Sequence, residues 1–125
     1  PLAEMPTFYA LADAMLVTMR DDLSVNDTLP GKVQSYMAAG KPILGSIAGE
    51  TPEIVAEAGC GLCAPPENAQ AFADTVRAFI ARTDQAQMGE NARRYYEAHF
   101  TKQGHMDRLE AMLAALCEEG KPCES

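Results

Sequence analysis

The sequence lacks the features of several large classes of protein. None of its apolar runs approaches the ~20 residues that a membrane-spanning helix needs. It opens with Pro-Leu-Ala-Glu-Met-Pro, without the basic and apolar stretches of a signal peptide. Basic residues are few, 10 Lys and Arg against 18 Asp and Glu, and the formal net charge of -8 argues against a nucleic-acid partner. We therefore expect a cytoplasmic protein that does not bind nucleic acid.

A second pair of closely spaced cysteines is also missing. Cys60 and Cys63 form a C-x-x-C motif, but Cys117 and Cys123 are poorly spaced to complete a zinc site. In a redox motif a helix amino terminus lowers the thiol pKa, whereas the residues 64–66 that follow here, Ala-Pro-Pro, predict a strand running into a loop. We expect reduced, partly buried thiols and no metal site.

The length of the chain allows one domain. A chain of 125 residues can bury a core of its own without disulfides or metals. The sequence begins without Met and runs directly into patterned segments. We therefore interpret residues 1–125 as a single domain taken from a longer protein.

Helical and strand-like segments alternate along the chain, which is typical of an α/β domain with a parallel sheet. Strands are predicted at 14–19, 43–47 and 62–64, and helices at 5–12, 31–39, 51–58, 69–81, 84–99 and 102–119. A doubly wound domain usually has about five or six strands. We expect a Rossmann-like three-layer domain that is incomplete at its amino terminus.

Several local patterns make sharper predictions. The near-continuous apolar run at 14–19 predicts a strand covered on both faces. Thr51 is expected to cap a helix that has Pro52 at its first position. An apolar stripe on the last helix is expected in the core, and any exposed part of it would drive dimerisation. Its members are Met106, Leu109, Leu113 and Leu116. Residues 120–125 are expected to fray.

Two loops are expected at the carboxyl ends of strands, where open α/β sheets bind ligands: residues 21–32 and 48–51. In the first, the N–H groups of residues 31–33 point out of the positive end of a helix. Gly31 permits close approach of a ligand and Lys32 adds a cation, a combination that suits a diphosphate. By spacing alone a plain helix start remains an alternative, because Pro-Gly-Lys also occurs in ordinary loops.

The second loop allows two interpretations. Gly49 and Glu50 either line the same pocket or form a turn before the next helix, and the turn is slightly favoured. His99 and His105 lie on the distal helices and are expected at the surface.

Three segments, in order and at the right spacing, resemble the donor domain of family 4 glycosyltransferases: residues 13–17, 29–44 and 49–55. Pro30-Gly31-Lys32 before the Tyr-Met-Ala-Ala-Gly-Lys-Pro run at 36–42 is most similar to bacterial members that transfer aminosugars or build surface polysaccharides. Residues 59–62 and 66–73 match the next strand and helix of that family.

The resemblance implies the carboxy-terminal, donor-binding half of a GT-B fold, in which two Rossmann-like domains flank a cleft. The implied reaction is retaining, metal-independent transfer of a hexosyl or N-acetylhexosaminyl group from a nucleoside diphosphate sugar, a UDP-sugar, in polysaccharide or glycoconjugate synthesis. No cofactor is implied. The amino-terminal acceptor domain is expected to be missing, so this piece alone should be inactive. A lipid-linked acceptor would place the full-length protein at the inner membrane face.

The family signature, two glutamates separated by seven residues, is altered here. Asp27 in the first position keeps a carboxylate for the hydroxyls of the donor sugar and is the candidate catalytic residue. Ser35 in the second position offers the ribose one hydroxyl, a weaker partner than a carboxylate. The departing diphosphate needs electrostatic stabilisation, which we assign to the amides of residues 31–33 and to Lys32. The candidate donor-binding residues are Asp27, Thr28, Leu29, Pro30, Gly31, Lys32, Val33, Ser35, Gly49 and Glu50.

Two alternatives remain open. A nucleotide-sugar epimerase shares the two-domain fold, but it needs acid–base carboxylates near the sugar, and Asp27 is the one candidate. A non-catalytic interaction module would have kept the fold and lost the ligand, and the two altered glutamate positions favour that idea.

Overall fold

The structure, a computed structural model, describes residues 2–119, except for the side chains of Val25 and Glu119. Three strands form one parallel sheet in the order β1-β2-β3: β1 (Met15–Thr18), β2 (Ile43–Ser46) and β3 (Gly61–Ala64). The helices are α1 (Met5–Leu11), α2 (Leu23–Asn26), α3 (Gly31–Ala38), α4 (Glu50–Ala58), α5 (Ala69–Ala81), α6 (Gln85–His99) and α7 (Lys102–Glu119), and a 3-10 turn (Leu2–Glu4) precedes α1.

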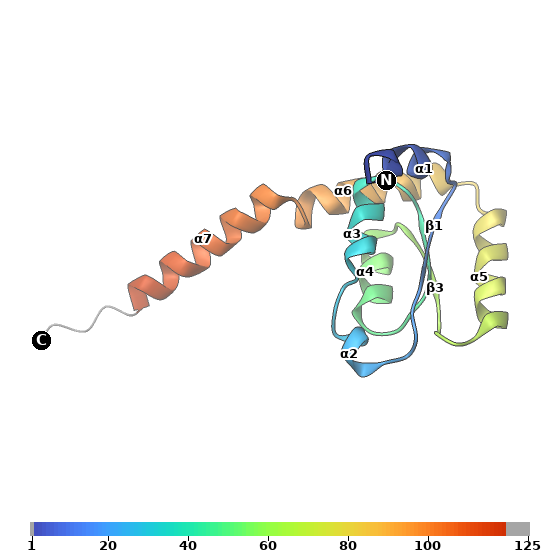
Figure 1. The fold of residues 1–125 in the computed structure, drawn as a ribbon, viewed down its shortest axis with the longest axis horizontal. Coiled ribbons are helices and arrows are strands. Elements are labelled where there is room, and N and C mark those ends of the chain that lie inside the picture. Colours follow the sequence, from blue (N-terminus) through green and yellow to red (C-terminus); the bar gives the residue numbers. More distant parts are fainter. Residues whose placement is uncertain (1, 120–125) are drawn as a thin grey trace, which may run out of the picture.

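The helices form layers on the two faces of the sheet. Helices α3 and α4 cover one face, and α5 covers the other (Figure 1). Helix α6 packs mainly against α3, and α7 projects away from the body (Figure 1). This arrangement confirms the predicted Rossmann-like α/β fold with a parallel sheet.

The core has a larger and a smaller half. The larger half lies between the sheet and helices α3, α4 and α6, and its buried members are Val17, Val33, Met37, Ile43, Ile47, Val55, Cys60 and Ala92. The smaller half joins Leu44 of β2 to Phe79 of α5 and Met88 of α6. Since full burial of one large apolar side chain contributes about 1.5–3 kcal/mol, the face under α3 and α4 carries most of the stability.

Local sequence signals set several boundaries. The Asn68 Oδ1 accepts a hydrogen bond from the Ala71 N–H at 2.9 Å and so fixes the start of α5. Gly59 ends α4 in the left-handed region with a φ of 64°. Gly61 lets β3 pair closely with β2, because a Cβ there would lie 1.9 Å from the carbonyl oxygen of Ile43.

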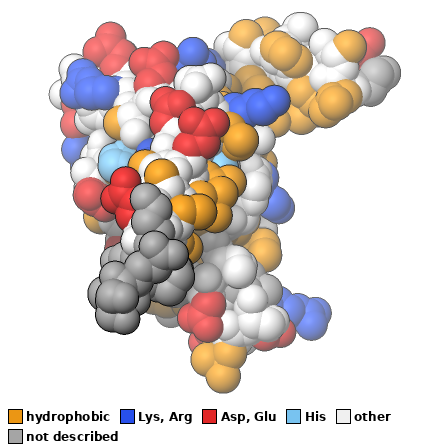
Figure 2. Space-filling model, turned by 90° about the vertical axis from the view of Figure 1, so that its left-hand side faces the viewer, with side chains coloured by type: hydrophobic (Ala, Val, Ile, Leu, Met, Phe, Trp, Pro, Cys, Tyr) orange, Lys and Arg blue, Asp and Glu red, His pale blue; other side chains and the backbone are white. Residues whose placement is uncertain are grey.

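Three expectations were wrong. Strand β1 is not covered on both faces: Leu16 is 53% exposed, because β1 lies at a sheet edge while α5 packs over β2 and β3. Thr51 does not cap α4, because the helix starts at Glu50, two residues before the predicted first position at Pro52, and has Gly49 as its N-cap. The apolar stripe on α7 is outside the core, with exposed fractions from 41% to 62%. Figure 2 views the molecule from the α7 end, the left-hand side of Figure 1, and shows hydrophobic side chains gathered over α7.

The predictions on the carboxyl terminus and on membrane-spanning helices concern different parts of the chain. The predicted fraying of residues 120–125 lies outside the described residues. Within residues 2–119, none of the helices combines the length and apolar character needed to cross a membrane.

Candidate functional site

The loops after β1 and β2 meet at the carboxyl edge of the sheet, beside α2 at the bottom of Figure 1. Gly49 has a φ of 83°, and a Cβ on it would lie 2.0 Å from the carbonyl oxygen of Asn26. A glycine is therefore required where the second loop touches the first. The structure thus brings the two predicted ligand loops together.

Two of the three aspartates in the first loop hold its shape. The Asn26 Nδ2 donates to the Asp21 Oδ1 at 2.9 Å. The Asp22 Oδ1 accepts from both the N–H and the hydroxyl of Ser24, at 2.9 and 2.7 Å, and these bonds lower the pKa of the Asp22 carboxyl. Asp27 is exposed and forms no ion pair within the described part of the chain. Asp27 is therefore the carboxylate left available for a ligand.

The amino end of α3 presents two open amides. Gly31 and Lys32 are exposed, and beyond the chain neighbours and helix backbone of Gly31 no atom lies within 4 Å of the position that a Gly31 Cβ would take. In the part of the chain that the structure describes, the N–H groups of these two residues have no backbone partner. The Val33 N–H donates to the Pro30 carbonyl at 3.0 Å, and the Val33 side chain is fully buried. The structure therefore corrects the expected three free amides to two.

The residues before this helix differ in exposure. Thr28 is exposed, whereas Leu29 and Pro30 are half-buried, and Leu29 packs against the core. This packing anchors the loop immediately before the open amides. Leu29 and Pro30 are thus placed to support the site, while Thr28 lies at its surface.

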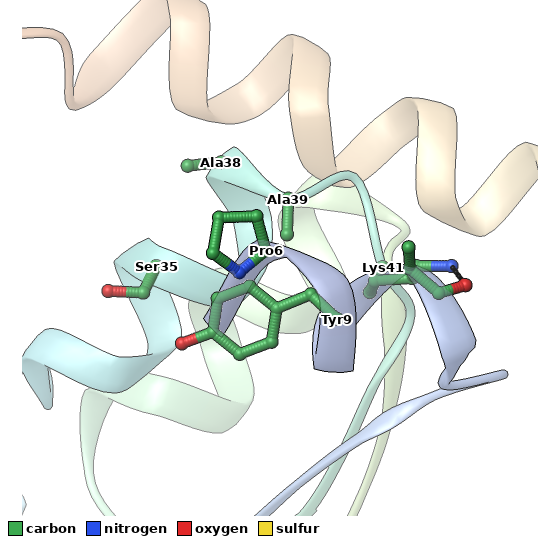
Figure 3. A pocket seen from close by; sticks show the side chains of 7 residues that line it. Pro6, Tyr9, Ser35, Ala38, Ala39 and Lys41 are labelled. Atoms are coloured by element: carbon green, nitrogen blue, oxygen red, sulfur yellow. Dashed lines mark hydrogen bonds between the residues drawn. The ribbon is translucent and has the colours of Figure 1, made fainter. Parts of the chain in front are cut away.

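Ser35 lies on the same face of α3 as Lys32, three residues further along. Its hydroxyl donates to the Gly31 carbonyl at 3.3 Å, so the Ser35 oxygen remains able to accept a hydrogen bond. Ser35 also lines a cavity of about 450 Å³ between α1 and α3, where Pro6 and Tyr9 face it across the gap (Figure 3). The rest of the wall is Ala10, Ala38, Ala39 and Lys41.

The second loop, residues 48–51, has a structural role at the start of α4. Gly49 is the N-cap of α4 and packs on Asn26, as the turn interpretation predicted. Glu50 is the first residue of α4 and is exposed, where its charge suits the helix dipole. Among the described residues, the Glu50 side chain forms no hydrogen bond or ion pair with residues 27–35.

Two polar atoms near this edge were missed from the sequence. Among the described residues, the Asn26 Oδ1 and the Thr51 Oγ1 are buried without a hydrogen-bond partner. Buried polar groups are almost always paired, so an unpaired one requires an explanation such as a water or a ligand hydroxyl. The sequence signal was weak: Asn26 precedes Asp27, and Thr51 was interpreted as a helix cap.

The cysteines have no place in the candidate site. Cys60, Cys63 and Cys117 are free thiols. Burial raises the pKa of Cys60 to about 12 and that of Cys63 to about 11, the opposite of what a reactive thiol requires. Within residues 2–119, no group of three His, Cys, Asp or Glu side chains is arranged to hold a metal ion. His99 and His105 are exposed, as predicted.

These observations define an α/β domain with an open helix amino terminus at the carboxyl edge of a parallel sheet, where such domains hold ligands. The family model of glycosyl transferases group 1 matches residues 1–95, so the chain belongs to this family. The fold is similar to that of sucrose-phosphate synthase from Thermosynechococcus elongatus, with a TM-score of 0.69 and 24% identity. That likeness covers 87% of this chain and 27% of the synthase chain. No curated protein sequence matches the chain.

Proposed function

We propose that residues 1–125 are the donor-binding half of a GT-B glycosyltransferase and hold the diphosphate of a nucleotide sugar at the amino end of α3. The observation that carries the proposal is the pair of open amides at Gly31 and Lys32, next to the Lys32 ammonium. A helix amino end carries roughly half a positive charge, and phosphate oxygens are its natural ligands. In a chain of net charge -8, this local device replaces a general attraction for anions.

Each exposed residue of the edge then has a role. The two amides and Lys32 stabilise the charge that develops on the departing diphosphate, where removal of one such donor typically costs about 2.7–4 kcal/mol of the barrier. Asp27 accepts hydrogen bonds from hydroxyls of the donor sugar, and Ser35 accepts one from the ribose.

The finer identity follows from the resemblance in the segments at 30–32 and 36–42. We infer a bacterial family 4 enzyme that transfers a sugar from a UDP-sugar with retention and without a metal, for surface polysaccharide synthesis. A lipid-linked acceptor would bind to an amino-terminal domain outside residues 1–125, at the inner membrane face. Purified alone, this chain should show no transferase activity.

One observation favours the alternative of a non-catalytic interaction module. Ser35 stands where a glutamate is expected, and its hydroxyl proton is already engaged by the Gly31 carbonyl. A domain that has lost donor affinity in this way would act as an interaction module. The two possibilities differ in whether the amino end of α3 still binds a diphosphate.

An amide-resolved NMR titration of the chain with uridine diphosphate tests this directly. The proposal predicts saturable shifts concentrated on residues 27–35, which Lys32→Ala weakens by about tenfold, the loss expected for one charge-assisted hydrogen bond. Arg77→Ala, an exposed cation on α5 paired with Asp74, is the matched control and should leave the affinity unchanged. Absence of saturable shifts at millimolar ligand would favour the interaction module.

A further inference from the structure

A second polar crevice lies where α3, α6 and α7 meet. In Figure 1 this junction is on the left side of the compact body, where α7 leaves it, whereas the carboxyl edge of the sheet is at the bottom. The crevice has a volume of about 390 Å³, within the range of about 300–1,000 Å³ that is usual for small-ligand pockets. Its lining residues are Gln34, Tyr96, His99, Phe100, Lys102 and His105.

Hydrogen bonds fix the corner that forms this crevice. The Thr101 hydroxyl oxygen accepts from the Gly104 N–H at 3.2 Å, and the Thr101 carbonyl accepts from the His105 N–H at 2.9 Å. The Arg108 guanidinium then donates to the carbonyl of His99 at 2.7 Å and ties α7 back to the end of α6. The walls are thus held in place before any ligand arrives.

The lining combines one lysine with two histidines and a glutamine, and it contains no carboxylate. His99 comes from α6, while Lys102 and His105 come from α7, with the Arg108 guanidinium nearby. Within the described residues Lys102 has no ion-pair partner.

Two carboxylates are close to the crevice along the chain, and each has a partner. Glu97 is paired with Arg93 at 2.8 Å, and Asp107 accepts a hydrogen bond from Gln103 at 2.7 Å. Lys102 thus carries a charge that no carboxylate of the lining compensates, in a chain of net charge -8.

The first turn of α7 breaks a local rule in the same place. Acidic residues suit the positive amino end of a helix, yet this turn has none and instead carries Lys102 and His105. Such local conflicts, when nothing nearby compensates them, are expected at functional sites. An anion in the crevice would offset the charge of Lys102 and suit the positive end of the helix.

We propose that this crevice binds the phosphate group of a small ligand. Lys102, His99 and His105 approach from two helices and donate to different oxygens of the tetrahedral anion. Gln34 adds a neutral donor from α3, and the rings of Tyr96 and Phe100 cover the carbon portion of the ligand. The site is separate from the amino end of α3 and does not depend on the function proposed above.

Titration of the 125-residue chain with inorganic phosphate, followed by NMR of the histidine side chains and backbone amides, tests the proposal. Saturable shifts on residues 99–105 are expected. Lys102→Gln should weaken binding by about tenfold. Lys41→Gln, a lysine that lies outside the crevice, should leave it unchanged.

Because Lys102 is exposed, its variant should keep the amide spectrum of the folded chain, which separates loss of binding from loss of fold. Shifts confined to residues 27–35, or equal affinity in the Lys102→Gln variant, would overturn the proposal. Two further probes then show whether the phosphate belongs to a soluble molecule or to a lipid. One is glycerol 3-phosphate, and the other is phosphatidylcholine vesicles that contain phosphatidic acid. If the chain binds glycerol 3-phosphate and Lys102→Gln weakens that binding, the ligand is a free metabolite. If the chain binds only the vesicles and Lys102→Gln weakens that binding, the ligand is a lipid headgroup. Binding of neither probe would also overturn the proposal.

Discussion

The contact between Gly49 and Asn26 makes the most quantitative prediction. In Gly49→Ala, the new Cβ would start 2.0 Å from a backbone carbonyl oxygen, and the φ of 83° with a ψ of -145° is a conformation that other residues rarely adopt. The conformation alone costs about 1–3 kcal/mol, and α2 must also move to relieve the clash. We expect a total loss of about 2–4 kcal/mol in the free energy of unfolding, or roughly 8–16 °C in Tm for a chain of this length.

Urea unfolding followed by circular dichroism measures this loss, and Gly31→Ala is the control. A Cβ on Gly31 would meet no atom within 4 Å beyond its chain neighbours and its own helix backbone, so this substitution should be neutral or stabilise the chain by about 0.4–1 kcal/mol. Gly31→Ala should nevertheless weaken diphosphate binding, because its methyl group faces the open side of α3. A Gly49→Ala variant within about 0.5 kcal/mol of the wild type would refute the packing of the two loops.

Other predictions concern the helices and the thiols. Asn68→Ala should lower the free energy of unfolding by about 1 kcal/mol in urea titrations, because it removes the cap of α5, and a smaller change than a few tenths would contradict that role. Of the three described thiols, Cys117 is exposed and should react with a thiol reagent at neutral pH before Cys60 and Cys63, whose raised pKa values keep them protonated; faster labelling of Cys60 or Cys63 than of Cys117, located by mass spectrometry, would contradict this. Above pH 9.0, the unfolded value, the unfolded chain loses these protons while the folded chain keeps them up to pH 11 to 12, so stability should fall as the pH rises through that window in pH-dependent melting curves. The exposed stripe of α7 has the 3-4-3 spacing of a coiled-coil seam, so the chain should associate at high concentration in analytical ultracentrifugation and Leu113→Glu should reduce that association; identical profiles would exclude this face.

The sequence predicted the order of elements well because its boundary signals are local. The Asn68 cap fixed the start of α5 at the predicted residue, and Gly59 ended α4 where expected. Exposure was harder to predict, because it depends on what packs nearby. Leu16 belongs to an apolar run, yet it is exposed because β1 lies at the sheet edge. The stripe on α7 has core-like spacing, but α7 leaves the body.

The local geometry at the start of α3 was predicted in outline and corrected in detail, while the binding roles of its residues stay predictions. Gly31 and Lys32 are open as expected because a helix start follows from Pro30 and the apolar pattern after it. The occupied N–H of Val33 was not predictable, since it depends on how the first turn closes onto Pro30. The unpaired oxygen of Asn26 depends on a contact between two loops, which no linear pattern records.

The central claim is that the amino end of α3 holds the diphosphate of a nucleotide sugar. A crystal structure of the chain grown with uridine diphosphate tests it most directly. The account predicts phosphate oxygens about 2.7–3.2 Å from the amide nitrogens of Gly31 and Lys32. Uridine diphosphate bound elsewhere on the chain, with these two amides facing only water, would contradict it.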